Sequence, residues 1–146
     1  MLLKAFHKYF FPTEHKNIII LSVDSNRKDL NTVANTVAAE GYNILTATEA
    51  KEALYLASTH KPNLIIVDLS LPDMPSLQLF RQLKEQQDTK DIPVIVLTKH
   101  NTSQFILDAY EFGIDNYLIK PFTRKVLLKL VDEVLRDSRS ASVPWA

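Results

Sequence analysis

Four short apolar runs in this sequence each lead directly to a polar residue. They are Ile18–Val23 followed by Asp24, and the runs Asn63–Asp68, Ile92–Thr98 and Tyr117–Lys120, which end in the polar residue itself. Runs of this length, rich in β-branched residues and bounded by turn formers, are typical of strands buried on both faces of a parallel sheet. Neighbouring parallel strands end at the same edge, where open α/β sheets bind their ligands. The sequence therefore predicts that two carboxylates, a hydroxyl and an ammonium group meet at one edge.

The segments between these runs carry helical periodicity. Apolar residues recur at the spacing of one helix face in five stretches. The predicted inward stripes are Leu30, Val33, Ala34 and Val37; Ala50, Ala53, Leu54 and Ala57; Leu79, Phe80 and Leu83; Phe105, Ile106 and Ala109; and Val126, Leu127, Leu130, Val131 and Val134. With a second strand at Tyr42–Ala47, this alternation predicts an α/β fold with a doubly wound parallel sheet.

Turn and cap residues mark where these helices begin and end. Gly41 and Gly113 follow helical segments and suit C-terminal caps. Thr48 and Thr123 precede helical segments and are predicted N-caps, and Pro75 suits a first helical position.

Composition limits the kinds of protein this chain can be. Its 146 residues suit one domain, and 17 basic residues balance 17 acidic ones. Without a Lys/Arg run we expect no direct binding of nucleic acid. The absence of cysteine excludes a thiolate nucleophile and fits a reducing compartment. No apolar run approaches the roughly 18 residues of a membrane span and no signal peptide is recognisable, so we expect a cytoplasmic protein.

A carboxylate at the end of one strand is often only solvated, or caps the next turn. When several polar groups lie at one edge, a shared structural reason is hard to find, and this favours a functional site. Lys120 and Asp68 carry opposite charges and would attract each other there. A carboxylate held in this way can act as a nucleophile.

The chain resembles the receiver domain of two-component response regulators. The matching stretches are Ile19–Asp24, Pro62–Met74, Val94–Thr98 and Gly113–Phe122. They occur in the family's order, and the resemblance as a whole extends over about residues 17–136. The resemblance implies a flavodoxin-like sheet with strand order 2-1-3-4-5. It divides the chain into an N-terminal arm (1–16), a receiver domain (17–138) and a tail (139–146), with no output domain expected after the last helix.

The resemblance also implies roles for individual residues. Asp68 matches the phosphoacceptor, which takes a phosphoryl group from the phosphohistidine of a sensor histidine kinase or a histidine phosphotransfer protein. Lys120 and Thr98 match the groups that bind the phosphoryl oxygens, and Tyr117 matches the aromatic switch residue that follows Thr98. Asp24, Asp68 and the Ser70 backbone carbonyl match the Mg²⁺ ligands. The Lys120–Pro121 bond is expected to be cis.

Three positions depart from the family pattern. Ser25 stands where the family usually has a second acidic metal ligand, so Mg²⁺ binding is expected to be weakened. Lys99 replaces a small residue after Thr98, where it could crowd the phosphodonor, add a cation or simply be solvated. Ser76 lies in a loop that commonly holds a glycine, and serine tolerates positive φ poorly.

These departures leave two other hypotheses open. One is a degenerate receiver that binds partner proteins without being phosphorylated. The other is an aspartate-nucleophile phosphatase of the haloacid dehalogenase type, which needs a general acid two residues after the nucleophile, where this chain has Ser70. The main prediction is a phosphoacceptor switch rather than an enzyme, with at most slow autodephosphorylation.

Two surfaces are candidates for protein contacts. The face formed by the helix that ends at Gly113, the strand Tyr117–Lys120 and the helix after Thr123 is expected to carry the output to a downstream partner, or to a second copy of the chain. In the arm, Leu2, Phe6, Tyr9 and Phe10 would share one face of a helix that Pro12 ends. Residues 1–11 could thus contact a partner protein, another subunit or an anionic membrane surface, or the arm could pack on its own domain or be disordered.

Overall fold

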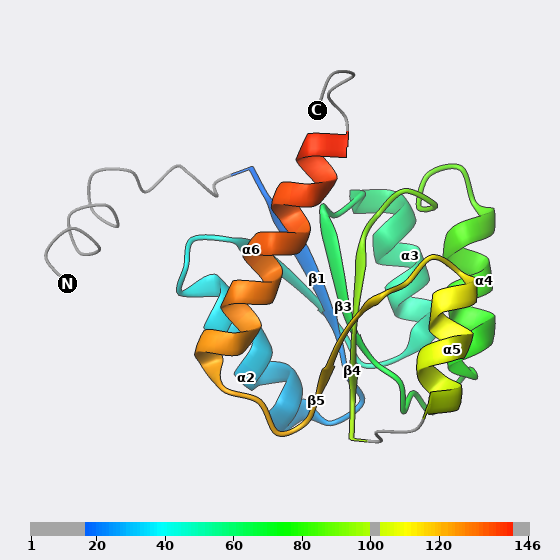
Figure 1. Cartoon of the computed structure of the whole chain (residues 1–146), viewed down its shortest axis with the longest axis horizontal. Helices are drawn as coiled ribbons and strands as arrows, with labels where there is room; N and C mark the ends of the chain where they lie inside the picture. The colour runs from blue at the N-terminus through cyan, green and yellow to red at the C-terminus, as the bar shows by residue number, and fades with distance from the viewer. Residues whose placement is uncertain (1–16, 100–102, 142–146) are drawn as a thin grey trace, which may run out of the picture.

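Strands and helices alternate along the chain as the sequence predicted (Figure 1). The computed structural model describes residues 17–99 and 103–141. The strands are β1 (Ile19–Val23), β2 (Asn43–Ala47), β3 (Leu64–Asp68), β4 (Val94–Thr98) and β5 (Asn116–Ile119). The helices are α2 (Arg27–Ala38), α3 (Ala50–His60), α4 (Ser76–Glu85), α5 (Ser103–Glu111) and α6 (Arg124–Ala141), which continues past residue 138.

The five strands form one parallel sheet in the order β2-β1-β3-β4-β5, which confirms the predicted topology. Every residue of the two central strands β3 and β4 is buried, whereas the edge strands β2 and β5 are partly exposed. The near-continuous apolar sequence of the central strands follows from this burial, because helices cover both faces of the sheet.

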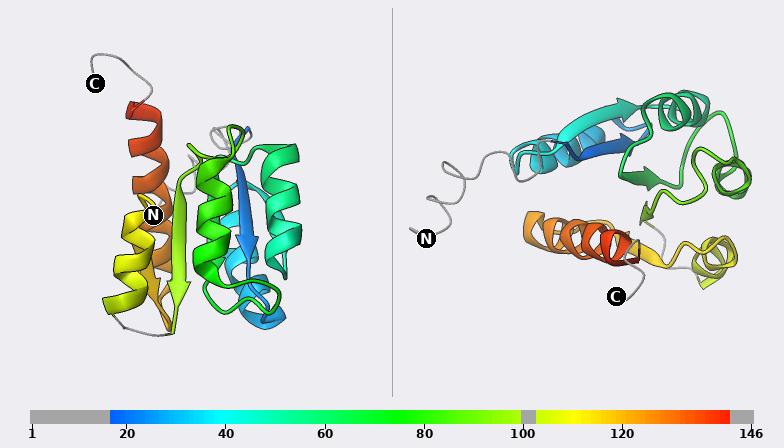
Figure 2. Two further views of the ribbon diagram at one scale, coloured as in Figure 1. Left: turned by 90° about the vertical axis from the view of Figure 1, so that its right-hand side faces the viewer. Right: turned by 90° about the horizontal axis from the view of Figure 1, so that it is seen from above.

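Helices α2 and α6 cover one face of the sheet, and α3, α4 and α5 cover the other (Figures 1 and 2). The side chains of successive residues in each strand pack against the helices on opposite faces of the sheet. Ile66 packs with the α2 and α6 side chains, whereas its neighbours Ile65 and Val67 pack with those of α3 and α4. Two hydrophobic cores therefore fix the sheet from either side.

The strand register aligns the ends of the strands at one edge. Val23 pairs with Val67, so Asp24 lies level with Asp68. Asp68 pairs with Leu97, which puts Thr98 one residue further along, and Thr98 in turn pairs with Ile119, the residue before Lys120. The sheet itself therefore brings the four polar residues to the same edge.

Most of the predicted helix stripes are buried, with one correction in α6. Leu127, Val131 and Val134 are buried as expected, but Val126 is 46% exposed. Leu135, which the predicted stripe did not include, is also buried, so Leu127, Val131, Val134 and Leu135 form the buried stripe of α6. The side chains of Phe105 and Ile106 lie outside the described part of the structure.

The predicted N-cap of α3 is wrong. Thr48 does not precede the helix directly, and Glu49 at the N-cap makes no side-chain capping bond. The backbone N–H groups of Ala50 and Lys51 instead donate to the carboxylate of Asp73, at 2.8 and 2.9 Å. A carboxylate is a stronger acceptor than a hydroxyl and also interacts favourably with the helix dipole. This tertiary contact fastens the loop after β3 to the start of α3.

The other caps agree more closely with the sequence. Thr123 accepts a hydrogen bond from the Val126 N–H at 3.2 Å and caps α6. Gly41 and Gly113 follow α2 and α5 with φ of 96° and 76°. Pro75 is the N-cap of α4 rather than its first residue, and Ser76 begins that helix. Among the described residues, Lys61 is the only non-glycine residue with a positive φ. Ser76 therefore has a negative φ, and its backbone is not in the left-handed conformation that strains a serine.

We expect Asp73→Ala to lower the melting temperature by a few degrees at pH 7, because two N–H groups at the start of α3 lose their acceptor. The backbone hydrogen bonds from Lys51 and Ala50 hold the pKa of Asp73 below its ordinary value of 3.8. The stabilisation is therefore complete above pH 3.8 and is lost as the pH falls through the lowered pKa.

Circular dichroism melts across this pH range measure the effect. Asp88→Ala is the control, because Asp88 is exposed and pairs only with Lys61, at 3.7 Å. Equal melting temperatures for Asp73→Ala and Asp88→Ala at pH 7 would contradict the role of Asp73 as a cap.

Candidate functional site

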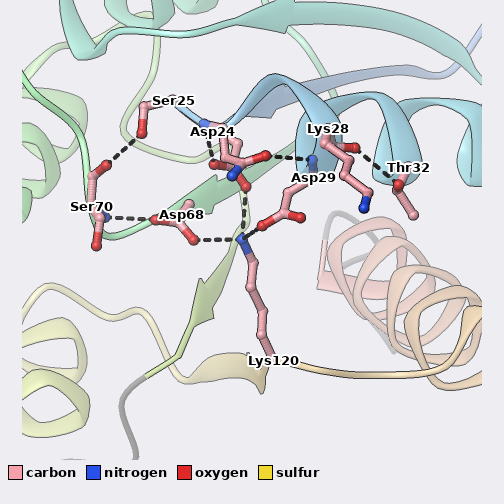
Figure 3. A network of polar contacts seen from close by, with 9 residues as sticks. Asp24, Ser25, Lys28, Asp29, Thr32, Asp68, Ser70 and Lys120 are labelled. Carbon is pink, nitrogen blue, oxygen red and sulfur yellow. Dashed lines mark hydrogen bonds and ion pairs between the residues drawn. The ribbon is translucent and has the colours of Figure 1, made fainter.

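The ammonium group of Lys120 lies among three carboxylates at the carboxyl edge of the sheet (Figure 3). Its Nζ is 2.8 Å from Asp24 Oδ2, 2.8 Å from Asp68 Oδ2 and 3.0 Å from Asp29 Oδ2. An ammonium group has three protons, and here it donates to Asp24 and Asp29 and forms an ion pair with Asp68. The structure thus brings together Asp24, Asp68 and Lys120, which the sequence placed at this edge.

Burial makes this cluster more than a surface ion pair. The side chains of Asp24, Asp68 and Lys120 are 4%, 8% and 11% exposed. Attraction between charges in contact is several-fold stronger in such surroundings than in bulk water. Removing Lys120 would leave two buried carboxylates without their counter-ion.

The charges around Lys120 control its ionisation. Burial by itself would lower the pKa of Lys120, but the hydrogen bonds to Asp24, Asp68 and Asp29 outweigh it and raise that pKa well above its usual range. Lys120 is therefore a permanent cation at physiological pH.

The other oxygens of the two buried carboxylates accept backbone hydrogen bonds. Asp24 Oδ1 accepts from the Asn26 N–H at 2.9 Å, and Asp68 Oδ1 accepts from the Ser70 N–H at 2.7 Å. Each carboxylate thereby fixes the turn that follows its own strand. The orientation of both side chains is set before any ligand arrives.

Asp29 is a site residue that the sequence analysis missed. It lies in the first turn of α2, where Asn26 caps the helix by accepting from the Asp29 N–H at 3.0 Å. Its hydrogen bond with Lys120 lowers the pKa of Asp29. The sequence feature that could have indicated Asp29 is an acidic residue in the first turn of the helix after Asp24. Its partner Lys120 lies 91 positions further along the chain.

Ser25 lies beside the expected metal ligands, and its hydroxyl donates to the Ser70 backbone carbonyl at 2.9 Å (Figure 3). The carbonyl that the resemblance assigned to a metal therefore has a partner within the protein. A carbonyl oxygen has a second lone pair, so this bond does not block a ligand completely.

The oxygen donors suit Mg²⁺, although the set is small. Asp24, Asp68 and the Ser70 carbonyl are hard oxygen ligands, and Mg²⁺ commonly uses one or two carboxylates together with phosphate oxygens and water. In residues 17–99 and 103–141, no three His, Cys, Asp or Glu side chains are arranged to hold a metal by themselves. A metal here would depend on water or on a phosphorylated ligand.

Thr98 and Tyr117 lie next to the cluster, on β4 and β5. Thr98 is only 2% exposed, and its backbone carbonyl accepts from the Lys120 N–H at 2.7 Å. Both side chains line a small cavity of about 10 Å³, with Leu69 and Ala109 among its other walls. Tyr117 itself is 42% exposed and so lies at the boundary between this cavity and solvent.

Lys99 is exposed and helps to line an open pocket of about 530 Å³ beside the cluster. Asp29, Lys120 and Phe122 belong to the same pocket. The Lys120–Pro121 peptide bond at its base is cis. The three interpretations of Lys99, which are crowding of the phosphodonor, added positive charge and simple solvation, stay predictions.

Comparison with known proteins identifies the class of this fold and site. The family model described as the response regulator receiver domain matches residues 20–132. The chain therefore belongs to the response regulator receiver domain family. Receiver domains act as phosphoacceptor switches, work with histidine kinases and downstream effectors, and generally bind Mg²⁺ in their acidic pocket.

Individual relatives agree with this assignment. The alkaline phosphatase synthesis transcriptional regulatory protein PhoP of Bacillus subtilis is 31% identical over 123 residues, which is 84% of this chain and 50% of PhoP. The chain spans about half or less of the length of the curated relatives it matches.

Solved structures show the same fold. A CheY-like receiver domain protein from Methanospirillum hungatei has a TM-score of 0.80 and 25% identity, over 85% of this chain and 98% of that one. CheY4 of Vibrio cholerae has a TM-score of 0.75 and 27% identity, over 80% and 98%.

We expect Lys120→Met to lower the free energy of unfolding by about 3 kcal/mol at pH 7, because Asp24 and Asp68 would then be buried together without a counter-ion. The folded pKa of Lys120 lies above its unfolded value, so the stabilisation by Lys120 is complete below about pH 10 and is lost only as the pH rises through the folded pKa.

Urea unfolding at pH 7 measures the loss. Adding Asp29→Asn to Lys120→Met should return part of the stability, because it removes one of the repelling charges. No loss in Lys120→Met, or a further loss in the double variant, would show that the ion pairs do not hold this edge together.

Proposed function

We propose that Asp68 accepts a phosphoryl group from a phosphohistidine and carries it as an acyl phosphate. A carboxylate oxygen of Asp68 would attack phosphorus, forming an O–P bond as the P–N bond to the imidazole breaks. The leaving imidazole nitrogen takes the electron pair of that bond and picks up a proton. The observation that supports this role is the Lys120 Nζ, 2.8 Å from Asp68 Oδ2 at the open edge of the sheet.

The neighbouring groups are suited to assist the transfer. Phosphoryl transfer depends mainly on positioning and on neutralising the charge of the phosphoryl oxygens. Lys120 supplies a permanent positive charge beside Asp68, and Thr98 supplies a buried hydroxyl at the end of the next strand. We propose that both bind phosphoryl oxygens.

Asp24, Asp68 and the Ser70 carbonyl are the residues that would hold Mg²⁺. When bound, the ion would supply positive charge that offsets the negative charge of the phosphoryl oxygens. Ser25 makes this site weaker than one with a third carboxylate at that position, because its hydroxyl is neutral and engages the Ser70 carbonyl.

We further propose that the signal leaves through the face made by α5, β5 and α6. Exposed apolar side chains lie on all three elements, at Leu107 and Tyr110 on α5, Tyr117 on β5 and Val126 on α6. Thr98 and Tyr117 share the small cavity behind this face, which is too small for a tyrosine ring. Movement of Thr98 toward a phosphoryl group would therefore admit Tyr117 only if α5 also shifts.

The proposed partners follow from this chemistry. The phosphodonor is a sensor histidine kinase or a histidine phosphotransfer protein. The output partner is a downstream protein or a second copy of this chain, and we propose a cytoplasmic location. Among the described residues, none of the helices combines the length and apolar character needed to cross a membrane. The suggested membrane contact of residues 1–11 lies outside the described residues.

One observation favours a second candidate function, a receiver that binds partners without phosphorylation. Ser25 donates a hydrogen bond to the Ser70 carbonyl, and three carboxylates already surround the Lys120 ammonium. A site closed in this way could remain a purely structural feature. Direct phosphorylation distinguishes the two functions.

We expect wild-type protein to gain one phosphoryl group when incubated with acetyl phosphate and Mg²⁺, and Asp68→Asn to gain none, because the amide lacks the nucleophilic oxygen. Mass spectrometry of the intact protein measures this. Asp88→Asn removes a carboxylate far from the site and should be phosphorylated like the wild type. If Asp68→Asn and wild type behave alike, the phosphoacceptor function is wrong.

We expect Ser25→Asp to bind Mg²⁺ about tenfold more tightly, because it adds a negative charge next to Asp24 and frees the Ser70 carbonyl. Isothermal titration calorimetry of the unphosphorylated protein measures the affinity. Ser25→Ala frees the carbonyl without adding charge, so it separates the two effects. An unchanged affinity in Ser25→Asp would place the metal elsewhere.

A further inference from the structure

Asp29 differs from the other two partners of Lys120 in its exposure. Its side chain is 35% exposed, whereas those of Asp24 and Asp68 are 4% and 8% exposed. Asp29 also borders the open pocket of about 530 Å³ beside the cluster. A carboxylate in this position can exchange an ammonium partner for water at low cost, while a buried carboxylate cannot.

Asp29 also supplies a negative charge to the site in place of the one that Ser25 lacks. Position 25 is a serine, but Asp24, Asp29 and Asp68 still place three carboxylates around one ammonium group. Their formal charges sum to minus two, and without Asp29 the sum would be minus one. The third negative charge is therefore directed at Lys120 from α2.

The donor capacity of Lys120 limits what can bind next to Asp68. In the resting site the ammonium group donates to Asp24 and Asp29 and forms an ion pair with Asp68 at 2.8 Å, and it has only three protons to share among these carboxylates. A phosphoryl oxygen that binds Lys120 must therefore replace one of the present acceptors. Asp29 is the partner with the longest contact, at 3.0 Å, and the greatest exposure, so its displacement costs least.

We propose that Asp29 is a positioning residue of this site. In the resting protein it holds the Lys120 ammonium between Asp24 and Asp68, and when Asp68 is modified the hydrogen bond that Lys120 donates to Asp29 is donated to a phosphoryl oxygen instead. Its charge also takes the place of a carboxylate at position 25 in attracting a cation. This inference rests on the proposed phosphoacceptor function.

The effects of Asp29→Asn on a cation and on an anion should have opposite signs. Loss of one negative charge should weaken Mg²⁺ binding about fivefold in the unphosphorylated protein. The same loss, which weakens the hold of residue 29 on the Lys120 ammonium, should tighten binding of beryllofluoride, an anionic phosphoryl mimic, about fivefold at saturating Mg²⁺. Damage to the fold would weaken both ligands, so the opposite signs identify the role of Asp29.

Calorimetry with MgCl₂ alone, and then with beryllofluoride, measures both affinities. Asp88→Asn is the matched control, since it removes the same charge at a surface pair with Lys61 and should change neither affinity. Asp29→Glu keeps the charge and should restore Mg²⁺ binding to near the wild-type value.

A nuclear magnetic resonance measurement tests the positioning role directly. The Lys120 ammonium protons should give a visible ¹⁵N-correlated signal in the wild type, because they are held by three carboxylates. In Asp29→Asn that signal should broaden as exchange with water becomes faster, while Asp88→Asn should leave it unchanged.

Two outcomes separate failure of this inference from failure of the proposed function. If wild type binds beryllofluoride and Asp29→Asn shows unchanged affinities and an unchanged ammonium signal, Asp29 has no such role. If wild type does not bind beryllofluoride even at saturating Mg²⁺, the phosphoacceptor function fails, and this inference fails with it.

Discussion

The ion pairs between Lys120 and the carboxylates of Asp24, Asp68 and Asp29 are the interaction on which the arrangement of this edge depends. They join the ends of β1, β3 and β5 and the first turn of α2, which are distant along the chain. Without the ammonium group, two buried carboxylates would face each other in a medium that screens charge poorly. The cluster therefore closes the carboxyl edge of the sheet and at the same time holds the proposed nucleophile.

The loop after β3 connects this cluster to the rest of the fold. Asp68 orders the start of the loop through the Ser70 N–H, and Ser25 holds the Ser70 carbonyl. Further along, Asp73 caps α3. Each contact uses a short polar side chain to satisfy a backbone group that no helix or strand satisfies. The loop is thus fixed at three points, which keeps the proposed metal ligands near Asp68.

The serine at position 25 and the aspartate at position 29 have compensating effects on the charge of the site. Ser25 removes a charge from beside Asp24, and Asp29 supplies one from a helical turn further on. The total charge of the site is kept, while its distribution moves away from the proposed metal ligands and toward Lys120. This difference bears on how strongly the site holds a cation and on how it accepts a phosphoryl group.

The elements and their order could be predicted from the amino-acid sequence, because apolar runs of strand length and stripes of helical period report local burial. Once the strands are parallel and in register, the meeting of residues 24, 68, 98 and 120 at one edge follows. Which side chains touch each other at this edge could not be predicted and depends on the folded arrangement. The Lys120–Asp29 pair, the Asp73 cap on α3 and the Ser25–Ser70 bond each join residues more than twenty positions apart. Side chains of the same polarity are common along a chain, and only the folded geometry brings a particular donor within reach of a particular acceptor.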